Sequence, residues 1–305
     1  MKRVRLNLIL CVIVLALVGA VLLSQKKEAP KNPPLTALKA DAVSHIVLHH
    51  PKAADIVLDK KDGQWALTAP VQVAADPFEI NSLIGLATAE AKSSIDPKQV
   101  KLADLGLDPP GYDLTLNDVK IDFGGVEPLN YRRYVQTGGK IDLIDDPPAS
   151  ALDADYSDLV AKKLLPDKAE IASISVPGLK VTRGADGKSW TADPADPKAG
   201  SDELQQFADA WSKARALWNG AIPADAKPAA TPENISIVLK DGRTLNYTVV
   251  SRDPQLVLQS DELKIRYSLA KDDADKLLKL QSPPPPPAEQ QKAAPVAPAA
   301  TPEKK

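Results

Sequence analysis

Residues 55–68 read DIVLDKKDGQWALT, and residues 179–192 read LKVTRGADGKSWTA. Each stretch places an Asp-Gly pair, which tolerates the left-handed backbone of a tight turn, between runs of alternating apolar and polar residues. Alternation with a period of two is typical of strands, so each stretch predicts an antiparallel hairpin. Because both stretches have the same order of turn and tryptophan, they predict that one structural unit occurs twice.

Landmarks inside and outside these hairpins recur at a nearly constant offset of 124 or 125 residues. Three pairs show the offset: Ile46 and Ile171 (171 − 46), Trp65 and Trp190 (190 − 65), and Ile141 and Ile265 (265 − 141). Further strand pairs are expected in each half, over residues 112–125, 131–144, 234–250 and 255–270. Short turns favour antiparallel pairing, since parallel neighbours need a long crossover.

One helix is expected to cover the sheet of each half. In the first, Asp76 can cap a helix that starts at Pro77, with an apolar stripe at Ile80, Leu83, Ile84 and Ala87. In the second, the helical spacing runs over residues 201–218, with a stripe at Leu204, Phe207, Trp211, Ala214 and Trp218. Each half then ends in a short helical run, residues 151–165 and 271–280. The predicted class is α+β: an N-terminal transmembrane helix and two tandem repeats, each a mainly antiparallel sheet with a covering helix and a short C-terminal helix.

The N-terminal apolar segment predicts a membrane anchor. Residues 6–23 contain only Asn7 as a polar residue and have about the minimum length that crosses a hydrocarbon core of roughly 30 Å. Lys2, Arg3 and Arg5 precede the segment, so the positive-inside rule predicts a cytoplasmic N-terminus. The alternative is a cleaved signal peptide, with Val18 and Ala20 before the cut. The expected division is a cytoplasmic N-terminus (1–5), a transmembrane helix (6–23), a linker (24–40), two α+β repeats (41–167 and 168–281) and a disordered Pro/Ala-rich tail (282–305).

Composition argues against several functional classes. The net charge of −2 among 305 residues offers no basic excess, so we expect no nucleic-acid partner. Cys11 is the only cysteine and lies in the apolar segment, which leaves no thiolate for a metal or a disulfide beyond it. No GxSxG, HExxH, Walker A or dinucleotide motif occurs. We therefore expect a protein that is not an enzyme and needs no cofactor.

Several motifs make the chain similar to a known family. They are DGQWALTAP (62–70), LGLDPP (105–110), IDFGG (121–125) and YRRYV (131–135), in this order. The chain resembles the bacterial domain of unknown function 4340 family, most closely over the first repeat. The resemblance implies a bacterial envelope protein, often with one N-terminal anchor. Combined with the positive-inside rule, it predicts a single-pass inner-membrane protein whose C-terminal region is periplasmic. Some members look like companions of ABC-type export systems of the gliding-auxiliary kind, which implies an envelope protein as partner.

Two groups of side chains are candidates for binding. His45 and His49 share a strand face and are weak candidates for metal ligands, although a zinc site needs three or four. Arg132 and Arg133 stand between Tyr131 and Tyr134, so that one arginine points to each face. Either arginine could bind a carboxylate or phosphate of a ligand; the structural alternative is an ion pair with Asp122 or Asp142. Trp65 and Trp190 are expected to pack under the covering helices, and Trp211 and Trp218, aligned on one helix, are either core or an aromatic binding surface.

Three functions remain open. The preferred hypothesis is a non-catalytic, membrane-anchored periplasmic interaction module, accessory to an ABC-type transport or other envelope assembly. The second is a periplasmic protein that binds a glycan, lipid or peptide in a groove between the repeats, through Trp211, Trp218, Arg132 or Arg133. The third is an envelope hydrolase that uses carboxylates such as Asp76 and Glu79.

Overall fold

A computed structural model describes residues 32–281, except residues 52, 148–152, 198 and 228–230. The predicted transmembrane helix (6–23), the residues before it and the Pro/Ala-rich tail lie outside the described residues. Within the described ranges, no helix is long and apolar enough to cross a membrane. The chain divides into two compact units, Met1–Ala161 and Lys162–Lys305, so the division falls slightly before the expected boundary after residue 167.

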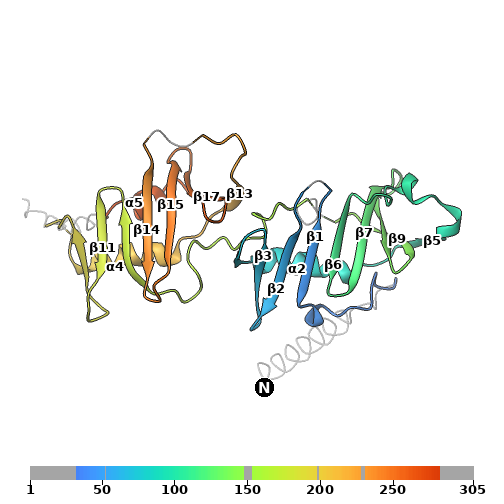
Figure 1. Cartoon of the computed structure of the whole chain (residues 1–305), viewed down its shortest axis with the longest axis horizontal. Coiled ribbons are helices and arrows are strands. Elements are labelled where there is room, and N and C mark those ends of the chain that lie inside the picture. Colours follow the sequence, from blue (N-terminus) through green and yellow to red (C-terminus); the bar gives the residue numbers. More distant parts are fainter. Residues whose placement is uncertain (1–31, 52, 148–152, 198, 228–230, 282–305) are drawn as a thin grey trace, which may run out of the picture. The chain divides into compact units, whose positions relative to one another are not determined.

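The first unit is a nine-stranded antiparallel sheet in the order β4-β3-β2-β1-β6-β7-β8-β9-β5. Its strands are β1 (His45–His49), β2 (Ile56–Lys61), β3 (Gln64–Ala69), β4 (Val73–Ala74), β5 (Ser93–Ile95), β6 (Tyr112–Leu116), β7 (Val119–Val126), β8 (Arg132–Thr137) and β9 (Lys140–Asp145). Helix α2 (Pro77–Gly85) lies across one face of this sheet (Figure 1). Short 3-10 turns occur at Ala40–Ala42, Leu86–Thr88, Pro97–Gln99 and Leu102–Leu105.

The second unit is an eight-stranded antiparallel sheet in the order β12-β11-β10-β14-β15-β16-β17-β13. Its strands are β10 (Ile171–Val176), β11 (Leu179–Arg183), β12 (Trp190–Asp193), β13 (Trp218–Ala221), β14 (Glu233–Leu239), β15 (Thr244–Ser251), β16 (Leu256–Ser260) and β17 (Ile265–Leu269). Helix α4 (Ser201–Lys213) lies across its sheet (Figure 1), and α5 (Asp273–Leu278) packs against α4. The α+β class with mainly antiparallel sheets is confirmed.

The two sheets have corresponding strand orders. With β10, β11 and β12 set against β1, β2 and β3, the remaining strands of the second sheet follow the order of the first, and only β4 has no counterpart. The hairpins also correspond in detail. The Lys60 ammonium lies 6.0 Å from the ring centre of Trp65, and the Arg183 guanidinium lies 5.2 Å from that of Trp190. In both units a cation therefore sits over the tryptophan opposite it on the neighbouring strand.

The expected turns form where the sequence places them. Asp62 and Gly63 both have positive φ, as do Gly138 and Gly139. At the turn between β6 and β7, Asn117 has φ 52°, and its side-chain carbonyl accepts hydrogen bonds from the backbone N–H groups of Ser44 and His45. A residue that tolerates the left-handed region thus also ties the turn to the start of β1.

Helix α2 buries the apolar stripe expected of it, and the stripe expected of the second helix is buried as far as Ala214 but not at Trp218. Asp76 caps α2 by accepting a hydrogen bond from the backbone N–H of Phe78 at 3.0 Å, and Pro77 occupies the first turn. The buried residues are Ile80, Leu83, Ile84 and Ala87 in and after α2, and Leu204, Phe207, Ala208 and Trp211 in α4. Trp190 packs against α4, since its indole donates to the side-chain carbonyl of Gln205 at 2.9 Å. These contacts place the core of each unit between sheet and helix.

Two helix predictions are wrong. The helix expected over residues 201–218 ends at Lys213, because Ala214 adopts an extended backbone (ψ 128°) and Leu217 donates to Ser268 of β17. Trp218 consequently begins strand β13. The run 151–165 forms turns instead of a helix over its described part, since Asp155 and Asp158 bond to local backbone N–H groups and compete with helical hydrogen bonds.

Part of the expected linker belongs to the first unit. Leu35 is buried and donates its backbone N–H to Ala89, while Thr36 donates to Ala87. Ala91 in turn donates to Pro33. The residues that follow α2 thus hold residues 33–36 against the unit.

Candidate functional site

Three of the four motifs that carry the family resemblance, LGLDPP, IDFGG and YRRYV, meet at one place in the first unit. Gly106, in LGLDPP, has φ 67°, and the backbone beside it passes directly over Gly124 of IDFGG. No side chain fits at Gly124, since a Cβ there would come within 2.4 Å of the Leu105 carbonyl oxygen. Position 124 of IDFGG therefore has to be glycine, because the LGLDPP loop passes so close to it.

Arg133 joins the third motif to this contact. Its guanidinium donates to the Gly124 carbonyl at 2.8 Å, and its Nε lies 2.5 Å from a carboxylate oxygen of Asp146. The expected structural ion pair is present, but its partner is neither Asp122 nor Asp142. Asp122 instead pairs with Lys120, and buried Asp142 accepts a hydrogen bond from Ser94. Arg133 thus braces the end of β7 and is not available to a ligand.

Aromatic and acidic side chains lie next to this brace. The Tyr112 hydroxyl donates to the Asp153 carboxylate, and the Tyr112 ring packs edge-on against His50 at 5.4 Å. The pKa of Tyr112 is raised, mainly because the hydrogen bond to Asp153 keeps its proton in place and partial burial disfavours the phenolate. This tyrosine is a structural donor and not an acid or base near neutral pH.

The loop between β7 and β8 follows the end of β7 that Arg133 and Asp146 hold in place. Two of its apolar side chains and that of the last residue of β7 are unusually exposed: Leu129 at 83%, Tyr131 at 74% and Val126 at 39%. Tyr131 also has φ 55°, a left-handed conformation that costs a non-glycine residue roughly 1–2 kcal/mol. We call Val126, Leu129 and Tyr131 the apolar loop. A strained, exposed aromatic residue contributes little to folding, and its side chain is accessible to contacts from outside the unit.

The remaining members of YRRYV flank the apolar loop. Arg132 and Tyr134 are half-buried, and Arg132 lies across the ladder from Asp145. The expected alternation holds, since Arg133 shares a face with buried Val135 and Arg132 shares the other with Tyr134. Of the four residues predicted here, Tyr131 is the one most open to a partner.

The matching loop of the second unit differs in chemistry. Between β15 and β16 the sequence Arg-Asp-Pro-Gln (252–255) replaces the apolar loop, and Lys271 pairs with Asp253. Only Val250, which precedes this loop, is an exposed apolar residue there, at 41%. The apolar loop is thus a property of the first unit.

His45 and His49 do not form a common site. The ring of His45 lies 2.7 Å from Asp59, and that of His49 lies 2.5 Å from Asp55. Four strand positions separate the two histidines by about 13 Å, too far for one ion. Across the described residues, no group of three or more His, Cys, Asp or Glu side chains is arranged to hold a metal.

The two tryptophans expected on one helix have different surroundings. Trp211 is completely buried, and its indole donates to the Leu277 carbonyl of α5 at 3.0 Å. Trp218, on edge strand β13, is 49% exposed. Trp211 is therefore a core residue, and Trp218 alone remains open to a ligand.

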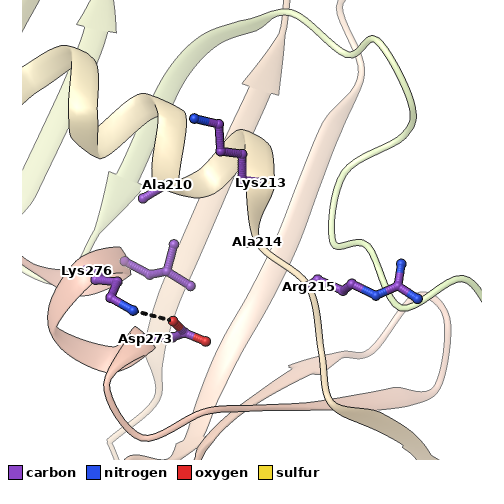
Figure 2. Close-up of a pocket in the computed structure, with 7 residues that line it drawn as sticks. Ala210, Lys213, Ala214, Arg215, Asp273 and Lys276 are labelled. Carbon is purple, nitrogen blue, oxygen red and sulfur yellow. Dashed lines mark hydrogen bonds and ion pairs between the residues drawn. The ribbon is translucent and has the colours of Figure 1, made fainter. Parts of the chain in front are cut away.

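A hollow of about 250 Å³ lies where α4 ends near α5 (Figure 2). Lys213 and Arg215 on its rim point away from each other, and Lys276 bonds to Asp273 at 3.2 Å (Figure 2). A second hollow in the first unit is formed by residues 98–101, Asp104 and Leu105. Neither gathers a nucleophile with a base, and neither is lined by Asp76 or Glu79. The capping bond of Asp76 accounts for its burial and gives no support to the hydrolase hypothesis.

Comparison with known families agrees with the motifs. The family model described as Domain of unknown function (DUF4340) matches residues 65–226, more than half of the 305 residues. The chain belongs to this family. Comparisons with curated proteins and with solved structures found no match.

Some residues of the site could not be identified from the sequence. Leu129 and Val126 fall in GVEPLNY (125–131), where apolar residues stand in a Pro- and Asn-containing turn with no strand or helix period. That mismatch between residue type and local structure was the available signal. Asp146 carried no signal of its own, because its role depends on where β9 ends beside Arg133.

Proposed function

We propose that this protein is a non-catalytic, membrane-anchored periplasmic interaction module that binds another envelope protein, such as a subunit of an ABC-type transport assembly, through the apolar loop. The observation that carries the proposal is the exposure of Leu129 and Tyr131 on a base held by Arg133 and Asp146. Exposed apolar side chains on a rigid support are favoured at protein interfaces, because little conformational entropy is lost on binding.

The anchor and the repeat belong to the same proposal. The apolar segment 6–23 supports a single inner-membrane span with residues 32–281 in the periplasm. The corresponding strand orders support an origin by duplication, with the apolar loop added in one copy. On this interpretation the second unit, with its polar loop, acts mainly as a scaffold.

Site-specific photocrosslinking in the native membrane tests the proposal. A photoreactive amino acid replaces Leu129 in the full chain, and the matched control carries it at Val250, which precedes the corresponding loop of the second unit. We expect one discrete adduct from position 129, reduced when Tyr131→Ala is added, and no such adduct from position 250. The same adducts from both positions, or none from position 129, would contradict it.

The ligand-binding hypothesis has weaker support. Two of its four proposed contacts are already used inside the units, since Trp211 is buried and Arg133 is held by Asp146 and Gly124. Arg132 and Trp218 remain, and they belong to different units. No single observation favours a glycan, lipid or peptide at either residue over a protein contact.

A further inference from the structure

The second unit exposes an apolar pair where its edge strand begins. Leu217 is 52% and Trp218 is 49% exposed. Strand β13 ends the sheet and pairs with β17, with Trp218 opposite Ser268. An exposed tryptophan on an edge strand offers a flat apolar surface and an indole N–H donor to an extended chain.

Basic side chains lie close to this pair along the chain. Arg215 precedes Trp218 by three positions, in a segment that already runs extended beside residues 162–164. Lys213 and Arg215 line the hollow in Figure 2, together with Lys276, which pairs with Asp273, and with Leu277 of α5. The surroundings thus combine apolar contact with positive charge.

The chain that follows α5 has the complementary chemistry. Gln281, the last described residue, is held to α5 by a hydrogen bond from its side-chain amide to the Asp275 carbonyl at 2.8 Å. Residues 283–287 are five consecutive prolines, and Glu289 follows them. Proline runs favour the polyproline II helix, which advances about 3.1 Å per residue and is recognised by exposed aromatic side chains.

We propose that Pro283–Pro287 binds Leu217 and Trp218 of the same chain, with Glu289 directed toward Lys213 and Arg215. Tethering at Gln281 favours this intramolecular contact, because a short linker gives an effective concentration on the order of mM. The contact covers the apolar pair at the edge of the sheet. It goes beyond the proposed function, since it lies in the second unit and does not involve the apolar loop.

Fluorescence quenching in the full-length chain in detergent tests this contact. Cys11, the only cysteine, is replaced by serine, and a bimane label is placed at Ala288→Cys; the matched control carries it at Ala299→Cys. Tryptophan quenches bimane on close approach. We expect stronger quenching at position 288 than at position 299, and recovery of the fluorescence at 288 when Trp218→Phe is added. Equal quenching at both positions, or quenching at 288 that persists after Trp218→Phe, would overturn the proposal.

A second variant separates the prolines from the tryptophan. Replacing Pro283–Pro287 by serines leaves both units unchanged and is expected to abolish the quenching at position 288. Dilution of the labelled protein should not alter the quenching, because the contact is intramolecular. Quenching that survives the serine replacement, or that disappears on dilution, would assign the signal to another contact and overturn the inference.

Discussion

The carbonyl oxygen of Leu105 lies so near Gly124 that a Cβ at position 124 would approach it to 2.4 Å and would also meet the Leu107 side chain at 3.0 Å. Two motifs separated in the sequence thus share one close contact. Glycine at position 124 is required by backbone proximity and not by a turn.

Gly124→Ala should therefore destabilise the first unit by roughly 1–3 kcal/mol, as expected when a methyl group is forced into a packed site. The matched control is Gly85→Ala in α2, where φ is −57° and nothing lies within 4 Å of an added Cβ. That change should stabilise the unit by up to about 1 kcal/mol. Urea denaturation of the full chain, followed by hydrogen exchange in residues 112–145, measures both; a neutral Gly124→Ala would contradict the contact.

Arg133→Gln should lower the stability of the first unit by about 1.5–3 kcal/mol, because Arg133 makes charge-assisted hydrogen bonds to Gly124 and Asp146. Arg132→Gln is the control and should change it by less than about 0.5 kcal/mol. The same denaturation experiment compares them. Equal losses from the two variants would show that the brace at Arg133 has no special role.

Tyr131→Gly should raise the stability of the first unit by about 1 kcal/mol, because it relieves the left-handed strain of a largely exposed residue. The same variant should lose the adduct from position 129. Lys264→Gly, at a similar φ of 56° in the second unit, should keep the adduct. If Tyr131→Gly still formed the adduct, the strained tyrosine would not be needed for binding.

Trp211→Phe should destabilise the second unit by roughly 1–3 kcal/mol, since it leaves the buried Leu277 carbonyl without its donor and removes packed volume. Trp218→Phe should stay within about 0.5 kcal/mol of the parent. Denaturation followed by hydrogen exchange in residues 204–221 and 265–278 distinguishes them. A small loss from Trp211→Phe would mean that α5 does not depend on this hydrogen bond.

The His49 and Asp55 pair predicts a pH dependence. The pKa of His49 is raised, chiefly by the hydrogen bond to the Asp55 carboxylate, so the folded state favours the protonated ring. Its contribution is fully present below the usual histidine pKa of about 6.5 and is lost as the pH rises through the folded value. The pair is exposed, so the change should stay below about 1 kcal/mol.

His49→Asn and Asp55→Asn should each remove this part of the pH dependence, because the first removes the titrating ring and the second removes the carboxylate charge that favours its protonation. Urea midpoints measured at pH values below and above this range, for the parent and both variants, provide the comparison. If the urea midpoint of the parent changes with pH in the same way as the midpoints of both variants, the assignment is refuted.

Local features of the fold were predictable from the sequence, and long-range ones were not. Asp62-Gly63 and Gly138-Gly139 set their turns by backbone conformation alone. The end of α4 could not be inferred in this way. Ala214 and Trp218 keep the helical spacing of apolar residues, whereas the backbone N–H of Leu217 donates a hydrogen bond to the Ser268 carbonyl of β17. The same limit applies to the candidate site. Tyr131 was identified from its motif, but the partner of Arg133 is Asp146 only because β8 begins beside the end of β9.

Strands β5 and β13 have a consequence for the order of assembly. Each is synthesised before four further strands of its sheet and pairs with the last of them. Ile95 of β5 pairs with Ile141 of β9, and Gly220 of β13 pairs with Arg266 of β17. At roughly 5–20 residues per second, each edge strand waits about 2–9 s for its partner. During that interval the growing chain has an unpaired strand, once for each unit.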